Sequence, residues 1–252
     1  MPGIRRRDLL VATGSGVVGG AAGGVAGFVT HRHFRRLPRG ATLSYSQSGE
    51  DVICRMIFDF LKTARPTYLD IGAYLPQAWN NTYLFYIQGA RGVLVEPNVA
   101  LIPELKSQRP GDTVLNIGIG LKDEKEADYY CFPIDQWNTF DREEAERRVK
   151  KSNVPIERVV KMPLRPINQV IEEHFHGKAP DFISIDVEGL DLAIMKTLDL
   201  KRFRPKVICA ETEIGRCIDS NAEMTQFFSQ HDYAARAVTF PNMIFVDKRL
   251  MT

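Results

Sequence analysis

Apolar and polar positions follow two different periods along residues 41–252, which indicates short strands separated by helices. Apolar runs bounded by Gly, Pro or acidic residues predict buried strands at Thr67–Gly72, Gly92–Glu96, Thr113–Ile119, Phe182–Asp186 and Lys206–Glu211. Apolar residues at helical spacing predict helices over Ser46–Lys62, Asn80–Gln88, the segment through Leu101 and Leu105, Leu190–Leu198 and Asn221–His231. Two last runs, Tyr233–Val238 and Met243–Val246, predict an antiparallel hairpin around Pro241 and Asn242.

This alternation predicts an α/β fold of the Rossmann-like kind. Strands that alternate with helices form a mostly parallel sheet with helices on both faces. With the C-terminal hairpin added, the expected sheet has seven strands. A chain of 252 residues is long enough for one substantial core. We therefore expect one domain over residues 41–252, preceded by a separate segment over residues 1–40.

Composition and charge narrow the possible partners. The chain has 33 Lys and Arg against 31 Asp and Glu, a formal charge of +2, and this balance gives no sign of nucleic-acid binding. The four cysteines, Cys54, Cys131, Cys209 and Cys217, are far apart and show no metal-binding spacing. We interpret them as reduced, mostly buried residues.

Acidic or amide residues stand at or near the ends of five predicted strands. They are Asp70, Glu96, Asn116, Asp186 and Glu211. In an open parallel sheet the carboxyl ends of the strands meet along one edge, where ligands bind. A single acid of this kind usually caps the next helix, but five strands that share the feature favour a ligand site.

The first two strand ends are typical of a nucleoside site. Asp70-Ile71-Gly72 provides a turn that a ligand can approach, and Glu96 can accept hydrogen bonds from both ribose hydroxyls. Tyr74 and Pro76 stand where a pyrophosphate-binding loop would need glycines, so NAD is disfavoured. No phosphate-binding loop of the G-x-x-x-x-G-K-[ST] type is present.

Several motifs together resemble the FkbM family of methyltransferases over about Tyr45–Val246. They are Tyr45-Ser46-Gln47-Ser48-Gly49-Glu50-Asp51, Asp70-Ile71-Gly72-Ala73, Asn81-Thr82, Val95-Glu96-Pro97-Asn98, Asn116-Ile117-Gly118 and Ile185-Asp186-Val187-Glu188-Gly189. The Glu-Pro-Asn and Asp-Val-Glu-Gly blocks are the most specific of these.

The resemblance implies a class I methyltransferase fold that uses S-adenosylmethionine to methylate a hydroxyl, often on a sugar or a polyketide. Carried over by position, Asp70, Gly72 and Ala73 would border the methionine part, Glu96 the ribose, and Asn98 and Asn116 the adenine. Gln47, Glu50 and Asp51 lie in the segment that covers the cofactor in such enzymes. The loop Tyr74-Leu75-Pro76-Gln77 departs from the pattern, because it lacks further glycines.

Asp186 and Glu188 are the candidate catalytic residues. Methyl transfer needs alignment of donor and acceptor and removal of the hydroxyl proton, which a positioned carboxylate can accept. A second use of Asp186, Glu188 and Glu211 is binding of Mg²⁺, which would lower the pKa of the acceptor hydroxyl. No metal ligand is assigned from the sequence.

The segment Tyr129–Pro163 is the expected acceptor-binding region. Trp137, Asn138 and Thr139 offer stacking surface and hydrogen bonds suited to a sugar. Within the same segment, Asp141–Lys151 pairs acidic with basic residues four positions apart, which predicts a solvated helix. The leading hypothesis is an O-methyltransferase for a small-molecule or glycan acceptor, a saccharide or lipid-linked saccharide. The alternatives are a non-catalytic S-adenosylmethionine-binding module and an NAD-dependent nucleotide-sugar enzyme.

The N-terminal segment allows three interpretations. Leu9–Val29 contains no charged residue, is long enough to cross a bilayer, and is flanked by arginines on both sides. We favour a membrane anchor with a cytoplasmic catalytic domain, because S-adenosylmethionine is made and kept inside cells. Arg6-Arg7-Asp8-Leu9-Leu10 also resembles a twin-arginine export signal. The third interpretation is a disordered arm on a soluble cytoplasmic protein.

Overall fold

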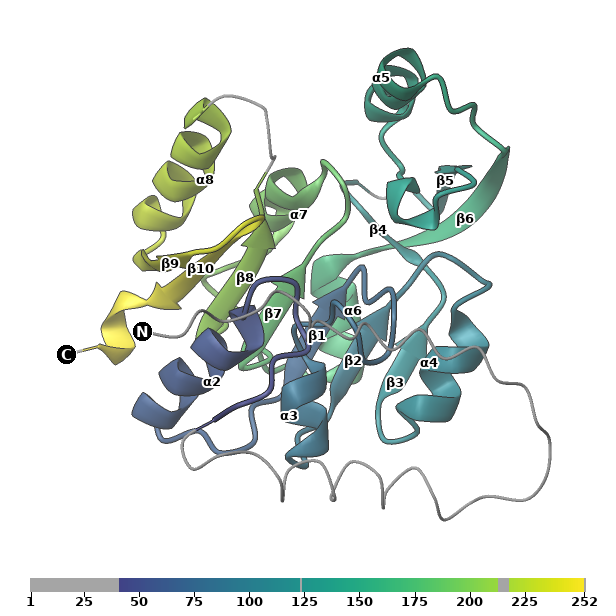
Figure 1. Ribbon diagram of the computed structural model, residues 1–252. Helices are drawn as coiled ribbons and strands as arrows, with labels where there is room; N and C mark the ends of the chain where they lie inside the picture. Colours follow the sequence, from purple (N-terminus) through teal and green to yellow (C-terminus); the bar gives the residue numbers. More distant parts are fainter. Residues whose placement is uncertain (1–40, 123, 213–217, 252) are drawn as a thin grey trace, which may run out of the picture. The chain divides into compact units, whose positions relative to one another are not determined.

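The main sheet confirms the predicted strand pattern. The computed structural model of the chain describes residues 41–122, 124–212 and 218–251. Seven strands pair in the order β3-β2-β1-β7-β8-β10-β9 (Figure 1). Their bounds are β1 Tyr68–Ile71, β2 Gly92–Val95, β3 Thr113–Leu115, β7 Phe182–Ile185, β8 Val207–Glu211, β9 Tyr233–Val238 and β10 Asn242–Asp247. β10 is antiparallel to β8 and β9, and the other pairs are parallel.

Helices cover both faces of this sheet, as the alternation predicted (Figure 1). On one face lie α2 (Glu50–Phe60), α3 (Tyr83–Ile87) and α4 (Ile102–Gln108). On the other lie α6 (Ile167–His174), α7 (Asp191–Thr197) and α8 (Ile218–Gln230). Phe58, Phe85 and Leu105 pack in the core of the first face. Ile171, Met195 and Phe228 pack in that of the second. The buried apolar area of two such cores is the main source of the fold's stability.

Helix α2 shows how local sequence places one of these layers. Gly49 precedes it with a φ of 90°, a conformation that favours glycine, and Glu50 and Asp51 occupy the first turn, where acidic residues suit the helix dipole. Cys54 and Phe58, one turn apart, are fully buried against the sheet. Glu50, in the first turn of α2, accepts a hydrogen bond from Asn242 at 3.2 Å. This bond fixes the N-terminal end of α2 beside the C-terminal hairpin.

A second, three-stranded sheet contains two strands, β5 and β6, in the segment for which the sequence predicts no strand. Its order is β4-β6-β5, with β4 at Gly118–Gly120, β5 at Glu126–Cys131 and β6 at Arg158–Pro166. Between β5 and β6 lie the 3₁₀ helix η1 (Asp135–Trp137) and α5 (Arg142–Ser152). The prediction of a single strand over Thr113–Ile119 was wrong. It divides into β3 and β4, which belong to different sheets.

The described cysteines are free and buried, as the sequence predicted. They are Cys54, Cys131 and Cys209, whereas Cys217 lies outside the described residues. The final short helix η2 (Lys248–Leu250) follows β10. Among the described residues, no helix has the length and apolar character needed to cross a membrane. The apolar run Leu9–Val29 lies outside those residues. Residues Leu43–Thr252 form one compact unit.

Candidate active site

The carboxyl ends of β1 and β7 approach each other so closely that only glycine fits between them. Gly72, directly after β1, has a φ of +83°, and a Cβ atom at this position would lie 1.8 Å from the carbonyl oxygen of Asp186. The backbone N–H of Asp186 donates to Ile71 at 2.9 Å, and that of Gly72 donates to Val95 at 2.9 Å. β1 is flanked by β2 and β7, so this is the point where the strand order reverses and ligands commonly bind.

A cleft opens at these strand ends. Gly72 and Glu96 line it on the side of β1 and β2, and Asp186 and Glu188 line it beyond β7. Asn138, from the insertion between β5 and β6 (residues 132–157), also lines it. The cleft therefore joins the expected nucleoside end of the site to the expected catalytic end.

Glu96 is the buried carboxylate at the nucleoside end. Its two oxygens accept the backbone N–H groups of Tyr74 at 2.8 Å and of Asn98 at 2.7 Å. Burial raises the pKa of Glu96 to about 7, although both hydrogen bonds act in the opposite direction. Each carboxylate oxygen keeps a further lone pair for a hydroxyl donor.

Asn98 and Asn116 have different positions relative to the cleft. Asn98 lines it, and its side chain accepts the N–H of Ala100 at 3.2 Å. Asn116 is not among the lining residues. Its side-chain amide donates to the carbonyl oxygens of Glu96 and Pro97, both at 2.9 Å. Asn116 thus holds the backbone that carries Glu96.

Two aromatic residues that sequence reasoning missed stand over the cleft. Tyr74 and Trp79 both line it, and their rings are stacked with centroids 6.2 Å apart and planes at 17°. Both have positive φ values, 48° and 52°. The Tyr74 hydroxyl donates to Asp135 of η1 at 3.0 Å, which connects this loop to the insertion. The sequence does contain a signal for these two site residues, because both are aromatic and both lie in the loop after the first predicted strand.

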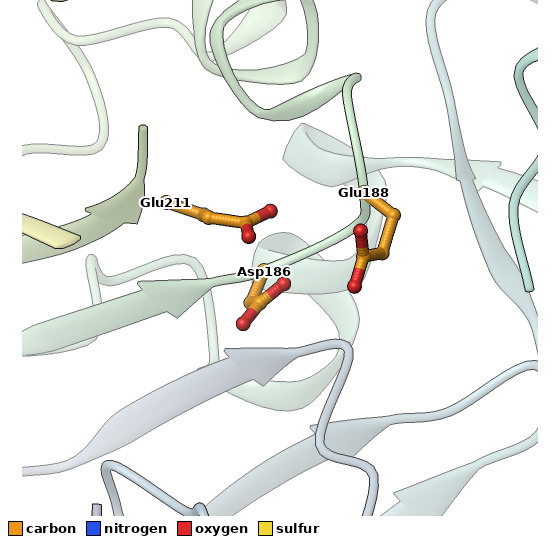
Figure 2. Close-up of side chains that lie close together, drawn as sticks. All are labelled: Asp186, Glu188 and Glu211. Carbon is orange, nitrogen blue, oxygen red and sulfur yellow. The ribbon is translucent and has the colours of Figure 1, made fainter. Parts of the chain in front are cut away.

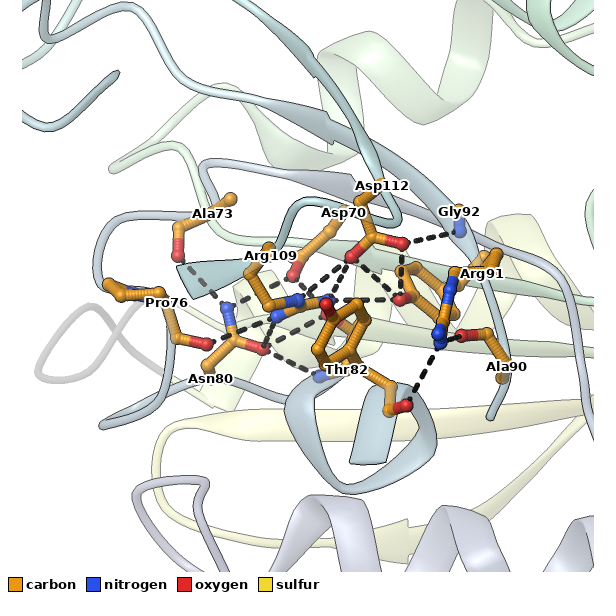
Figure 3. Close-up of polar contacts among 12 residues, drawn as sticks. Asp70, Ala73, Pro76, Asn80, Thr82, Ala90, Arg91, Gly92, Arg109 and Asp112 are labelled. Carbon is orange, nitrogen blue, oxygen red and sulfur yellow. Dashed lines mark hydrogen bonds and ion pairs between the residues drawn. The ribbon is translucent and has the colours of Figure 1, made fainter. Parts of the chain in front are cut away.

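Asp70 does not line the cleft. Its carboxylate is buried and accepts hydrogen bonds from Thr82 at 2.7 Å and from Asn80 at 3.2 Å (Figure 3). Arg109, fully buried, donates to Asn80 and Thr82 in the same network and pairs with Asp112 at 2.8 Å. Burial raises the pKa of Asp70, against the effect of Thr82, Arg109 and Asn80. Asp70 therefore supports the loop after β1 through hydrogen bonds and does not line the cleft.

Of the other residues expected near the cofactor, one lines the cleft and the rest are buried away from it. Gln47 lines the cleft, whereas the buried Ala73 is not among the lining residues. Glu50 and Asp51 are fully buried. Glu50 accepts from Thr239 at 2.5 Å, and Asp51 accepts from the Tyr45 N–H at 2.7 Å. Glu50 and Asp51 fold the segment that presents Gln47.

Asp186, Glu188 and Glu211 converge at the other end of the site (Figure 2). One carboxylate oxygen from each lies within 4.8 Å of the others. Glu188 adopts a φ of 57° and Gly189 one of 110°, so the chain turns directly after β7 and the Glu188 carboxylate stays near that of Asp186. Burial, and then the charge of Glu188, raise the pKa of Asp186 to about 7. Burial also raises the pKa of Glu211 well above its usual value.

Arg148 brings a positive charge to this cluster. Helix α5 places its guanidinium 2.5 Å from Glu188 and 2.6 Å from Glu144. Burial raises the pKa of Glu188, and the nearby guanidinium opposes that shift. The charge pairs along this segment predict only a solvated helix. The structure shows instead that one of its faces reaches the candidate catalytic residues.

The candidate acceptor residues lie partly in the cleft. Asn138 and Thr139 line it, and Thr139 donates to the carbonyl oxygen of Glu188 at 3.2 Å. Trp137 is not among the lining residues and packs edge to face on Phe132, with centroids 6.1 Å apart. The insertion is therefore attached directly to the turn that carries Glu188.

Comparisons with known proteins identify the class. The family model "Methyltransferase FkbM domain" matches residues 70–235. The solved structures similar to this chain include an O-methyltransferase from Bacillus cereus in complex with SAH, with 12% identity, a TM-score of 0.41 and 86% of each chain covered. A putative O-methyltransferase from Klebsiella pneumoniae has 10% identity and a TM-score of 0.40, with 86% of this chain and 84% of that chain covered. The methyltransferase domain of bacterial CtHen1-C has 9% identity and a TM-score of 0.37, with 79% and 96% covered. No curated protein matches.

The family match and the fold define an S-adenosylmethionine-dependent methyltransferase of class I, with S-adenosylmethionine as its cofactor. The chain belongs to the FkbM family of methyltransferases, as its motifs indicated. This membership selects the methyltransferase interpretation over the binding module and the NAD-dependent enzyme that the sequence left open.

Proposed function

We propose that this methyltransferase transfers its methyl group to a hydroxyl oxygen of a saccharide or lipid-linked saccharide. The observation that carries the proposal is the continuity of one cleft from Glu96 to the carboxylates of Asp186 and Glu188. A nucleoside held by the first end would place its reactive group toward the second, where a proton acceptor is available.

The residues at the cleft suit S-adenosylmethionine. Gly72 leaves the strand end open where any Cβ would clash with Asp186, and Glu96 keeps acceptor capacity for two ribose hydroxyls. Tyr74 and Trp79 offer a stacked aromatic wall. The carboxylates beyond β7 suit a positively charged sulfonium.

The cofactor-binding roles divide into contact and support. We assign direct contact to Gln47, Gly72, Glu96 and Asn98, which line the cleft. We assign support to Glu50, Asp51, Asp70, Ala73 and Asn116, which are not among the lining residues.

Asp186 is the proposed base, with Glu188 as its partner. S-adenosylmethionine, when bound, supplies a methyl carbon whose bond to sulfur breaks as the acceptor oxygen bonds to it, with the electron pair left on sulfur. Asp186 takes the hydroxyl proton, and its pKa of about 7 is suited to that exchange near neutral pH. Glu188, which pairs with Arg148, places a second carboxyl group beside Asp186. A Mg²⁺ ion at these carboxylates would be a second route to the same proton loss.

The acceptor is proposed to bind against the insertion. Asn138 and Thr139 line the cleft with polar groups, and Tyr74 and Trp79 add aromatic surface of the kind that stacks on sugar rings. Trp137 would act from behind, through Phe132. The apolar run Leu9–Val29 is the reason for including a lipid-linked acceptor, and residues 1–40 are proposed as a membrane anchor for the domain 41–252.

Calorimetric titration of the full-length protein tests the first part of this proposal. We expect S-adenosylmethionine to bind in the micromolar range, Glu96→Gln to weaken binding at least about tenfold, and NAD not to bind. Incubation with a panel of glycans and lipid-linked glycans, read as S-adenosylhomocysteine release, then tests the acceptor. Equal S-adenosylmethionine affinity in the wild type and Glu96→Gln would refute the role of Glu96. Methylation of nitrogen rather than oxygen in the product would refute hydroxyl transfer.

A further inference from the structure

The carboxylates beyond β7 and β8 lie close together and are paired with one described guanidinium, that of Arg148. Asp186, Glu188 and Glu211 offer oxygens within 4.8 Å of one another, from the ends of two neighbouring strands and the turn after one of them. Among the described residues, Arg148 pairs with Glu188, and neither Asp186 nor Glu211 pairs with a Lys or Arg. Such a group of hard oxygen atoms at close range is what a divalent cation binds.

A separate observation on a neighbouring strand points to the same ligand. Asn242 is only 3% exposed, and its side-chain oxygen Oδ1 has no hydrogen-bond partner among the described residues. Its amide nitrogen is already used, because it donates to Glu50 at 3.2 Å. Buried acceptors are rarely left unsatisfied, so this oxygen calls for a partner.

The strand register places that oxygen beside the cluster. Asn242 of β10 is the direct antiparallel partner of Glu211 of β8, and directly opposed residues project their side chains from the same face of a sheet. The side chain of Asn242, with its unsatisfied oxygen, therefore lies on the same face of the sheet as Glu211.

We propose that Asp186, Glu188, Glu211 and the Oδ1 atom of Asn242 form a binding site for one divalent cation of the Mg²⁺ or Mn²⁺ class. These ions are hard cations, which bind carboxylate and amide oxygens in preference to softer ligands such as thiolates. Because Asp186 and Glu188 line the cleft, the ion would stand beside the acceptor hydroxyl and favour its ionised form. The catalytic part of this inference rests on the proposed hydroxyl transfer, whereas binding of the ion does not.

Titration of the full-length protein with Mn²⁺, followed by the electron paramagnetic resonance signal of the free ion, tests the site. We expect one Mn²⁺ per chain with submillimolar affinity, displaced by Mg²⁺. Glu211→Gln should weaken this binding at least about tenfold, and Asn242→Leu should weaken it about threefold or more. Glu104→Gln, which alters a carboxylate in the first turn of α4, is the matched control and should bind Mn²⁺ as the wild type does.

Titration of the same samples with S-adenosylmethionine separates the possible failures. A protein that binds S-adenosylmethionine but takes up no Mn²⁺ at millimolar concentration overturns the cation site alone. Wild-type Mn²⁺ affinity in Glu211→Gln overturns it as well, and Glu188→Gln replaces that variant if Glu211→Gln does not fold. Mn²⁺ binding with the expected variant pattern in a protein that does not bind S-adenosylmethionine supports the site and refutes the proposed function.

Discussion

The guanidinium of Arg148 donates to the carboxylate of Glu188 at 2.5 Å, between residues 40 positions apart in the sequence. Arg148 belongs to α5 of the insertion, and Glu188 to the turn that follows the central strand β7. The same guanidinium bonds the buried Glu144 at 2.6 Å. One side chain therefore ties the candidate acceptor region to the candidate catalytic residues.

Replacement of Arg148 by methionine should destabilise the protein by about 1–3 kcal/mol. The change leaves Glu188 and Glu144 with less positive charge beside them in a half-buried place, and the loss of one partner from such a pair is costly. Chemical denaturation would measure the free energy of unfolding. The control is Arg142→Met on the same helix, whose partner Glu146 is exposed, so a much smaller loss of stability than in Arg148→Met is expected. Equal effects of the two substitutions would contradict a special role for Arg148.

Gly72→Ala should cost more than about 3 kcal/mol and abolish S-adenosylmethionine binding. The new Cβ would lie 1.8 Å from the Asp186 carbonyl oxygen, at a φ of +83° that disfavours alanine, so the ends of β1 and β7 must separate. Gly49→Ala is the matched control. Gly49 has a similar φ of +90°, but a Cβ atom there would meet no atom within 4 Å, so only the backbone strain of about 1 kcal/mol is expected. Similar melting temperatures for the two variants would refute the steric argument.

The parallel sheet could be predicted because its strands are nearly continuous apolar runs. Ile71 and Ile185 are both fully or almost fully buried, as a strand covered on two faces requires. The break between β3 and β4 could not be predicted, because Leu115, Ile117 and Ile119 suit one strand as well as two. The second sheet was missed for a related reason. β5 and β6 pair across the whole of α5, and such distant pairing leaves no local signal.

Strand-end position identified Glu96 and Asp186 but did not decide which way a side chain turns. Asp70 comes just before the end of β1 and points into a network with Thr82, whereas Glu96 follows β2 and lines the cleft. Asp70 is held there by Thr82 and Asn80, which in turn accept hydrogen bonds from the buried Arg109, and nothing in the sequence links Arg109 to Asp70. Tertiary contacts of this kind decide whether an acid serves the ligand or the scaffold.

Arg109→Met should destabilise the protein by about 3–5 kcal/mol without directly removing a cleft contact. Arg109 is fully buried and pairs with Asp112 at 2.8 Å, so its loss leaves buried carboxylates uncompensated (Figure 3). Thermal and urea unfolding would measure the loss. Asp70→Asn provides the functional comparison. If Asp70 supports the loop from behind, this variant should lose stability while its S-adenosylmethionine affinity, measured well below its melting temperature, changes less than about threefold. A large loss of affinity at unchanged stability would show that Asp70 contacts the ligand.

Glu96 should make the stability of the protein decrease as pH rises from about 4.5 to about 7. Its folded-state pKa of about 7 is above the ordinary value of 4.5, because burial disfavours the charged form. The folded state therefore keeps the proton while the unfolded state loses it, and stability present below the unfolded pKa is lost as pH rises through the folded one. A difference of this size corresponds to roughly 3 kcal/mol across that interval.

Comparison with Glu96→Gln isolates this effect from other titrating groups. The difference in free energy of unfolding between the wild type and Glu96→Gln should shift by roughly 3 kcal/mol in favour of the variant between about pH 4.5 and pH 8. Over the same range, wild-type affinity for S-adenosylmethionine should increase with pH, because the ionised carboxylate is the stronger acceptor for ribose hydroxyls. The variant should lack that increase. Parallel stability curves for the two proteins would mean that Glu96 is not the buried, proton-retaining carboxyl that its surroundings indicate.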